Sequence, residues 1–353
     1  MKLLFTGGGT LGSVMPLLGV LDELRARDAS LDFLWVGTAS GPERKIIEAR
    51  GIRFVWITAG KLRRYFDWRN ILLPLQIFDG LIKSLILLAY EKPSAVISAG
   101  GFVGVPLIWA AWICRVPVLI HQEDVVPGLA NRLAARAAEK ITVTFEKSAE
   151  AYPAKKTIVL GNPVRPEIFD YNLDEARGFF NLESGVPVVF VTGGGTGSAF
   201  LNNLVWDNLS RLTVFCQIIH SAGIGKLNPD IKYPRYHQFE ILTEGMANAL
   251  AVADLIVSRA GMGALSEFAA LGKPVILIPL PGHQEANAEI LKEKNAAVVW
   301  KQSEINNERF VAGLKELLAD REKLSSLGQN IHVAIKTDVR AAMADLIMEI
   351  IGH

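Results

Sequence analysis

The residues best suited to chemistry are the glycines of TGGGTGS at residues 192–198, which follow an apolar run and precede a helical pattern. Glycine tolerates positive φ and lets other groups approach the backbone closely. Successive N–H groups of such a loop can therefore point at phosphate oxygens near the positive end of a helix. The loop has no Walker lysine and no strict GxGxxG spacing, so a tight turn without a ligand remains an alternative.

A second strand-to-helix turn, SRAGMGALSE at residues 258–267, ends on an acidic residue. The carboxylate of Glu267, in the first or second turn of the helix, could accept hydrogen bonds from both hydroxyls of a ribose. The simpler alternative is a carboxylate that stabilises the helix N-terminus. Further on, Gln284 and Asn287 are three residues apart and share a face if helical, where amides can bind sugar hydroxyls or face solvent.

These patterns occur twice along the chain. LLFTGGGTLGS at residues 3–13 resembles VVFVTGGGTGS at 188–198, and AVISAGGFVGVP at 95–106 resembles LIVSRAGMGALSE at 255–267. Short apolar strands that alternate with helices predict parallel sheets covered on both faces. We therefore predict an α/β protein with two Rossmann-like domains, whose sheets face each other across a cleft with glycine turns at the strand carboxyl ends.

Length and composition agree with two folded domains. The chain has 353 residues, of which 50% are hydrophobic and 21% charged, and this composition excludes extended disorder. Two prolines and a Gly-Asn pair within residues 160–166 mark the predicted boundary. A final helix is predicted over 339–351, and its apolar spacing alone would let it pack on either domain.

Charge is unevenly spread along the chain. Residues 1–160 carry 20 Lys and Arg against 14 Asp and Glu, and the rest carry 17 against 22, which favours an anionic partner for the first half. Within it, residues 61–69 interleave four cations with three aromatics and precede an apolar segment. Residues 61–90 could therefore bind an anionic membrane surface, although a solvated loop before a buried helix is the alternative. The acidic second half argues against nucleic acid as a partner.

Three further patterns bear on membrane insertion, secretion and metal binding. Pro74, Asp79 and Lys83 interrupt the apolar segment, so we do not expect it to span a membrane. The first strand runs straight into a glycine cluster, so no secretory leader is expected. Cys114 and Cys216 have no partner at a metal-ligand spacing and no aspartate cluster is present, so neither a metal nor another cofactor is expected.

Four segments of the second half, in this order and spacing, resemble the MurG family: GNPVR (161–165), GGGTGS (193–198), SRAGMGALSE (258–267) and HQEANA (283–288). The likeness continues in the first half, through GGFVGVP and HQEDVVPGLANR. Members of that family have the glycosyltransferase-B fold and are peripheral proteins of the cytoplasmic face of the bacterial cell membrane. They move GlcNAc from UDP-GlcNAc to undecaprenyl-diphospho-MurNAc-pentapeptide (lipid I), which gives lipid II for peptidoglycan synthesis. The resemblance implies this hexosyltransferase activity and location here.

The resemblance also implies a UDP-GlcNAc site and a role for each domain. Residues 1–160 with the C-terminal helix in 337–353 would form the acceptor and membrane-docking domain, and 161–336 would bind the donor. Thr196 and Gly197 would hold the diphosphate. Arg165 would lie near the diphosphate, and Leu242 and Met246 would lie at the uracil. Glu267 would bind the ribose, and Gln284 and Asn287 would bind the GlcNAc. The other residues implied at the donor site are Thr10, Gly12, Arg259 and Gly263.

The first half departs from the family pattern at three motifs. The family's GGTGGH is GGTLGS here, its GGY is GGF, and its HEQN is HQED. Ser13 thus stands where a histidine is usual, and a serine can only position or relay a proton. Asp124 and Glu123 are therefore the predicted general bases. The implied acceptor-side residues are Gly9, Gly101, Phe102, His121 and Asn131.

Two other functions stay open. One is a UDP-GlcNAc 2-epimerase-like enzyme of the same fold, which needs acid and base residues around the sugar but no lipid acceptor. The other is a catalytically weakened paralogue that keeps the donor site and acts on, or merely binds, another lipid-linked acceptor.

Overall fold

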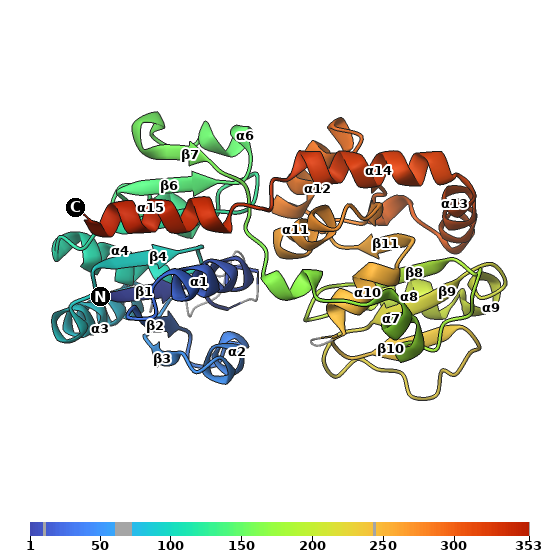
Figure 1. Cartoon of the computed structure of the whole chain (residues 1–353), viewed down its shortest axis with the longest axis horizontal. Helices are drawn as coiled ribbons and strands as arrows, with labels where there is room; N and C mark the ends of the chain where they lie inside the picture. The colour runs from blue at the N-terminus through green and yellow to red at the C-terminus, as the bar shows by residue number, and fades with distance from the viewer. Residues whose placement is uncertain (10–11, 61–72, 243–244, 353) are drawn as a thin grey trace. The chain divides into compact units, whose positions relative to one another are not determined.

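The structure is a computed structural model that describes residues 1–9, 12–60, 73–242 and 245–352. The chain divides into two compact units, of which the first is Met1–Arg165 with Thr337–His353 and the second is Pro166–Lys336. Each unit is built on one parallel sheet with helices on both faces (Figure 1). This architecture confirms the predicted α/β class with two Rossmann-like domains.

The sheet of the first unit has seven strands in the order β3-β2-β1-β4-β5-β6-β7, and each neighbouring pair is parallel. The strand order changes direction at β1, so the carboxyl ends of β1 and β4 form the switch point where sheets of this kind bind ligands. The strands are β1 (Lys2–Thr6), β2 (Asp32–Gly37), β3 (Arg53–Trp56), β4 (Ala95–Ser98), β5 (Val118–Gln122), β6 (Lys140–Val143) and β7 (Thr157–Val159).

The sheet of the second unit repeats this topology with six strands in the order β10-β9-β8-β11-β12-β13, again all parallel. Its switch point lies at the carboxyl ends of β8 and β11. The strands are β8 (Val188–Thr192), β9 (Gln217–Ser221), β10 (Tyr236–Phe239), β11 (Leu255–Ser258), β12 (Val275–Leu277) and β13 (Val298–Val299).

Helices connect the strands. Those of the first unit are α1 (Met15–Arg27), α2 (Glu43–Ala49), α3 (Leu73–Glu91), α4 (Gly104–Ile113), α5 (Leu129–Ala134), α6 (Glu146–Ala149) and α15 (Arg340–Gly352), with a short 3-10 turn at Ala154–Lys156. Those of the second unit are α7 (Leu173–Phe179), α8 (Ala199–Trp206), α9 (Leu209–Leu212), α10 (Met246–Val252), α11 (Met262–Ala270), α12 (His283–Glu293), α13 (Asn307–Ala319) and α14 (Arg321–Ala334), with 3-10 turns at Pro166–Phe169 and Gln302–Glu304.

Successive side chains of a central strand pack into two separate hydrophobic cores, one on each face of the sheet. Leu3 and Phe5 of β1 are fully buried in a cluster with α1 and α15, while Leu4 is fully buried in a second cluster with α4. This alternation follows from the pleat of a strand, and it explains why such strands are apolar throughout. In Figure 1, α15 (red) lies beside α1 and β4 of the first unit, although it is the last helix of the chain.

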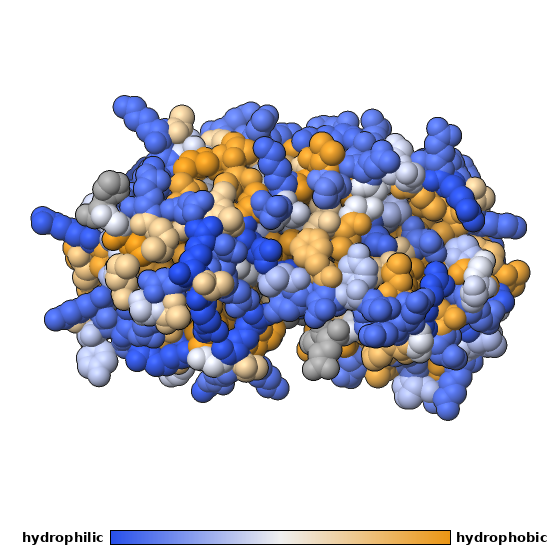
Figure 2. Space-filling view, viewed as in Figure 1, coloured by the Kyte–Doolittle hydropathy of each residue, from blue (hydrophilic) through white to orange (hydrophobic). Residues whose placement is uncertain are grey.

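Helix α3 is the one described helix long and apolar enough to cross a membrane, judged by length and composition alone. One side of it packs on its own unit, because Gly80 lies against the carbonyl oxygen of Thr58 and against Pro106 of α4. Its other side exposes several large apolar residues. Elsewhere, hydrophilic side chains cover most of the visible face of each unit, and apolar ones gather in smaller patches (Figure 2).

Candidate functional site

The glycine loop of the second unit connects β8 to α8. Gly194 and Gly197 have φ of +78° and +66°. A Cβ at Gly197 would overlap the carbonyl oxygen of Ala222, whereas a Cβ at Gly194 would have nothing within 4 Å. Close approach therefore requires glycine at 197, and backbone conformation alone favours it at 194. Ser198 then caps α8, since its Oγ accepts the N–H of Leu201 at 3.3 Å.

Two backbone donors of this loop are available for a ligand. Within the described parts of the chain, the N–H groups of Gly195 and Thr196 have no hydrogen-bond acceptor. A cation lies beside them, because Lys226 Nζ donates to the carbonyl oxygen of Gly197 at 3.4 Å and is otherwise exposed. Lys226 was not among the predicted residues, and its only signal in the sequence is that it follows a glycine-rich turn after β9. The loop therefore combines free N–H groups, a helix N-terminus and a positive charge.

Arg259 secures the base of the loop. Its Nε and Nη2 donate to Ser198 Oγ at 3.2 and 2.9 Å, and its Nη1 donates to the carbonyl oxygen of Ile278 at 2.7 Å. Nη2 also reaches Gln302 Oε1 at 2.8 Å, and the guanidinium lies over the ring of Phe200. Burial lowers the pKa of Arg259. Because these contacts use its donors on the protein, Arg259 shapes the loop.

The predicted sugar-contacting residues differ in exposure. Glu267 is half-buried in the second turn of α11, and Gln284 is half-buried at the start of α12, where its Oε1 accepts the N–H of Leu280 at 3.0 Å. Asn287 is fully buried, and its Nδ2 donates to the carbonyl oxygen of Ala260 at 3.1 Å. In this structure Asn287 therefore ties α12 to the turn that precedes α11.

The predicted uracil-binding segment follows β10. Leu242 is buried, and Met246 is half-buried as the first residue of α10. A Cβ on Gly245 would lie 3.2 Å from Leu242 Cδ2 and 3.3 Å from the Phe179 ring, so the segment is closely packed on α7. Gly263, in the first turn of α11, is half-buried.

A buried hydrogen-bonded chain supports the loop from beneath. Asn202 Nδ2 donates to the carbonyl oxygen of Ala222 at 2.9 Å, and Asn202 Oδ1 lies 3.1 Å from His220 Nε2. His220 Nδ1 lies 2.9 Å from the Tyr236 hydroxyl, which accepts the Trp206 indole N–H at 2.8 Å. Burial lowers the pKa of His220 to about 4, so it is neutral. His220 was not predicted, since its two partners come from separate segments, α8 and β10.

The glycine turns of the first unit meet each other. Gly9 and Gly101 have φ of +82° and +88°, and a Cβ at Gly101 would lie 2.9 Å from the carbonyl oxygen of Gly8. Asn131 approaches the same turn, with its Oδ1 3.1 Å from the position of a Cβ on Gly100. That Oδ1 is buried without a hydrogen-bond partner among the described residues. Three predicted acceptor-side positions thus lie at the carboxyl ends of β1 and β4.

A buried carboxylate that the sequence did not reveal supports the first glycine loop. Glu43 is fully buried, and its Oε1 accepts the N–H and the hydroxyl of Thr38 at 2.8 and 2.5 Å. Its Oε2 accepts the N–H of Gly9 at 3.2 Å. The loop continues into Gly12, which is half-buried, whereas Thr10 lies outside the described residues.

Of the predicted catalytic residues, Glu123 and Asp124 follow β5, and Ser13 follows the first glycine loop. Glu123 is buried, and burial together with the charge of Asp124 raises its pKa well above the ordinary value. A carboxyl group of this kind holds its proton more tightly than an exposed one and is better suited to donate a proton than to accept one. Asp124 is less buried than Glu123, and its own backbone carbonyl accepts Gln122 Nε2 at 2.7 Å. Ser13 Oγ is buried without a partner among the described residues.

The His121 side chain is buried and hydrogen-bonded within the first unit. It is fully buried, with Nδ1 3.0 Å from Thr142 Oγ1 and Nε2 2.8 Å from Asn162 Oδ1. Burial lowers its pKa to about 4. Phe102, which follows the second glycine turn, is half-buried.

The structure thus groups the predicted residues by unit. Arg165 belongs to the first unit, at the point where the chain passes into the second, and is half-buried. The first unit also holds Gly9, Gly12, Ser13, Gly101, Phe102, His121, Glu123, Asp124 and Asn131, and the second holds Thr196, Gly197, Leu242, Met246, Arg259, Gly263, Glu267, Gln284 and Asn287. Among the described residues, no group of three or more His, Cys, Asp or Glu could hold a metal ion.

Comparison with known proteins identifies relatives of both units. Residues 3–143 match the glycosyltransferase family 28 N-terminal domain, and residues 188–343 match the glycosyltransferase family 28 C-terminal domain. The chain is 37% identical over 347 residues to UDP-N-acetylglucosamine--N-acetylmuramyl-(pentapeptide) pyrophosphoryl-undecaprenol N-acetylglucosamine transferase 2 of Bacillus cereus, covering 96% of this chain and 98% of that one.

Solved structures share the fold. The crystal structure of MurG from Acinetobacter baumannii has a TM-score of 0.75 and 24% identity, covering 99% of each chain. A UDP-GlcNAc 2-epimerase from Neisseria meningitidis, bound to UDP-GlcNAc, has a TM-score of 0.70 and 14% identity over the same share of each chain. The epimerase shares the architecture alone, whereas the Bacillus enzyme is related over nearly its whole length. The chain therefore belongs to the MurG family of N-acetylglucosaminyltransferases, within glycosyltransferase family 28.

Proposed function

We propose that this protein transfers GlcNAc from UDP-GlcNAc to lipid I and so forms lipid II in peptidoglycan synthesis. The observation that carries the proposal is the 37% identity over 96% of the chain to a relative named for this transfer. In this assignment the second unit binds the donor, and the first unit binds the acceptor and the membrane. The geometry of the second unit supports the donor role, because its loop offers the elements that bind a diphosphate.

The donor site would act by stabilising the leaving UDP. Charge develops on the diphosphate as the bond to GlcNAc breaks, and donors fixed in advance lower the cost of that charge. The free N–H groups of Gly195 and Thr196, the N-terminus of α8 and the Lys226 ammonium supply such stabilisation. Arg259 holds the loop in place, and Glu267 would accept hydrogen bonds from the ribose.

The acceptor hydroxyl must lose a proton to a general base. A base must be ionised at the working pH and within reach of the hydroxyl. Burial and the neighbouring charge raise the pKa of Glu123 and favour its protonated form, so Glu123 is poorly suited to act as a base. Asp124 is more accessible, and we assign it the role of base. Ser13 would then position the acceptor.

The first unit would dock on the cytoplasmic face of the membrane as a peripheral protein. Leu75, Phe78, Ile82 and Ile86 recur every three or four residues of α3, so they form one stripe, and they are 66%, 60%, 42% and 64% exposed. Trp112 at the end of α4 is also exposed. Such side chains contribute roughly 1.5–3 kcal/mol each when fully buried. The basic part of the predicted membrane segment, residues 61–69, lies outside the described residues.

The membrane proposal is tested by cosedimentation with anionic lipid vesicles. Phe78→Glu with Ile82→Glu should weaken binding at least about tenfold, because two apolar contacts are lost and negative charge is added. Val333→Glu, on an exposed apolar residue of α14 in the second unit, is the matched control and should bind like the unmodified protein. Equal loss in both variants would point to a general charge effect and remove α3 from the proposal.

The transfer itself is tested with UDP-GlcNAc labelled in the sugar. The protein is incubated with and without lipid I, and lipid-extractable label and released UDP are followed. Label in the lipid fraction only when lipid I is present is the expected result. ManNAc or UDP-ManNAc as the product would instead identify a 2-epimerase, and tight UDP binding with no product would identify a binding paralogue.

A further inference from the structure

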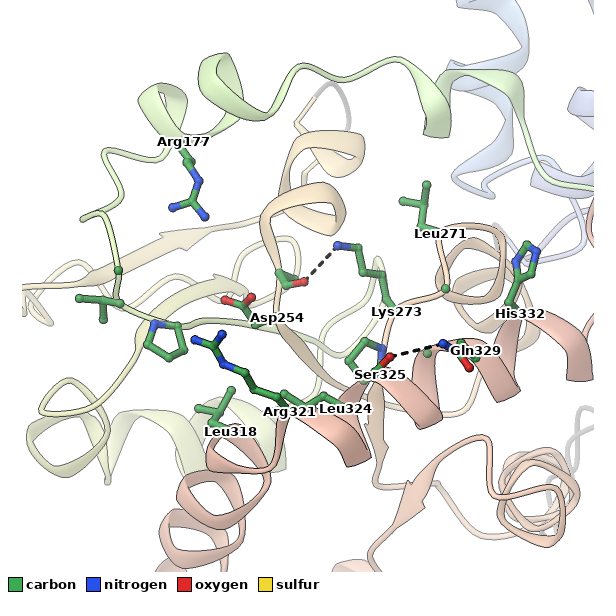
Figure 3. Close-up of a pocket in the computed structure, with 17 residues that line it drawn as sticks. Arg177, Asp254, Leu271, Lys273, Leu318, Arg321, Leu324, Ser325, Gln329 and His332 are labelled. Atoms are coloured by element: carbon green, nitrogen blue, oxygen red, sulfur yellow. Dashed lines mark hydrogen bonds between the residues drawn. The ribbon is translucent and has the colours of Figure 1, made fainter.

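A hollow of about 760 Å³ opens in the second unit at the end of the sheet opposite the glycine loop. Its floor lies where β8, β11 and β12 begin, with Pro187, Asp254 and Pro274 just before these strands. Helices α7 and α14 stand on its sides (Figure 3). The glycine loop follows the carboxyl end of β8, so the full length of the strand separates the hollow from the predicted donor site.

Two arginines direct uncompensated charge at this hollow. In the view of Figure 3, the guanidinium groups of Arg177 of α7 and Arg321 of α14 lie on opposite sides of the Asp254 carboxylate. Within the described chain, neither guanidinium has a hydrogen-bond or ion-pair partner. The other two charged residues of the lining, Asp254 and Lys273, form hydrogen bonds with backbone groups. Asp254 Oδ2 accepts the N–H of Val188 at 2.8 Å, and Lys273 Nζ donates to carbonyl oxygens of the α10 C-terminus, the nearer at 2.7 Å.

This concentration of positive charge is local. Residues 166–336 carry 15 Lys and Arg against 19 Asp and Glu, so the unit as a whole is acidic. The lining of the hollow has three such cations against one carboxylate. Burial lowers the pKa of Lys273, and the nearby charge of Asp254 acts in the opposite direction. Lys273 and Asp254 supply one charge of each sign, and both are hydrogen-bonded to backbone. The excess positive charge therefore resides on Arg177 and Arg321.

We propose that this hollow is a second ligand site, distinct from the donor site, that binds a phosphate-bearing small molecule. A planar guanidinium presents paired N–H donors that match two phosphate oxygens, and two of them on different sides suit a ligand with more than one anionic oxygen group. The volume lies in the range of small-molecule pockets. Leu271, Leu318 and Leu324 line the rest of the hollow and would contact the less polar part of the ligand.

The test is calorimetric titration of the full-length protein with inorganic pyrophosphate, in the presence of saturating UDP to occupy the donor site. The unmodified protein should bind pyrophosphate. The double variant Arg177→Ala and Arg321→Ala should bind it at least about tenfold more weakly, because each charge-assisted contact is worth more than a factor of ten. Arg177→Lys with Arg321→Lys should lose less, since it keeps the charge but not the paired donors.

A control separates this site from general charge effects and from any other anion site. Arg211→Ala with Arg309→Ala also removes two positive charges from this unit, but these arginines pair with Glu308 and Glu304. The control should bind pyrophosphate like the unmodified protein. No binding of pyrophosphate at millimolar concentration, or equal binding by both double variants, would overturn the proposal. The melting temperature of each variant shows whether it is folded. If the double alanine variant is not folded, the comparison is made with the double lysine variant.

Discussion

The assignment of the diphosphate to the second glycine loop can be tested by adding a single methyl group. Gly197→Ala places a Cβ where the structure has the carbonyl oxygen of Ala222, with the carbonyl carbon of that residue and the Cα of Gly223 each 2.7 Å away. All three neighbours are backbone atoms, so none can rotate away as a flexible side chain would, and the Asn202 amide holds the carbonyl oxygen of Ala222 in place. The loop itself must move.

Gly194→Ala provides a matched control within the same loop. Both positions have positive φ, so each alanine costs about 1–2 kcal/mol of backbone strain. The Cβ at 194 has nothing within 4 Å, and backbone strain is its whole cost. The steric overlap at 197 adds about 1–3 kcal/mol, the usual cost of overpacking. The loop relieves that strain by shifting, and its N–H groups then no longer point at one phosphate position.

Calorimetric titration with UDP and a thermal melt distinguish these effects. Gly194→Ala should lower the melting temperature while the Kd for UDP changes by less than about threefold, since its N–H groups stay in place. Gly197→Ala should raise that Kd at least about tenfold, which corresponds to 1.4 kcal/mol. Equal UDP affinity in the two variants would refute the reasoning, because it would show that the packing of this loop on Ala222 does not shape the diphosphate site.

Three further predictions follow from charges and burial. Lys226→Ala should raise the Kd for UDP about three- to tenfold without changing that for uridine, because only UDP carries the diphosphate; calorimetry with both ligands checks this. Asp124→Asn should reduce turnover by roughly 10²–10⁴ with unchanged UDP affinity, whereas Glu123→Gln, which resembles the protonated form that burial favours, should reduce it far less; a larger loss for Glu123→Gln than for Asp124→Asn would exchange their roles. Burial lowers the pKa of His220 to about 4, so the unfolded chain binds this proton more readily, and the free energy of unfolding should fall by about 3 kcal/mol as pH drops from about 6.5 to 4. Urea unfolding at pH 7 and 4.5 should show a smaller decrease for His220→Gln.

The glycine turns were predictable from the sequence because their cause is local. An apolar run, glycines and a helical pattern stand next to each other in the chain, and the structure has strand, turn and helix in that order at both loops. The local pattern does not show which residues hold these turns, because they come from elsewhere in the chain, and Arg259 was named only through the family resemblance. Glu43 is 34 residues from the Gly9 N–H that it accepts, and Arg259 is 61 residues from Ser198. Periodicity cannot show which distant polar side chain faces a loop.

The sequence also does not predict how exposed a given polar side chain is. Gln284 and Asn287 share one face of α12 by spacing, yet the first is half-buried at the edge and the second is fully buried. A helix that packs on a loop at its own N-terminus covers one residue of such a pair and leaves the other accessible. Spacing therefore predicts a common face, but packing decides which amide can reach a sugar.

The two glycine loops look alike in sequence, but their supports differ in a way that bears on their ligands. In the second unit the Gly194 N–H donates to the neutral hydroxyl of Thr192, and a lysine approaches the loop. In the first unit the corresponding region donates the Gly9 N–H to the buried carboxylate of Glu43. A carboxylate beneath a loop consumes a backbone donor and repels an approaching anion, and burial strengthens both effects. The first loop is therefore expected to bind a diphosphate more weakly than the second. This difference supports the proposal that the leaving UDP lies at the second loop and that the first loop orients the acceptor.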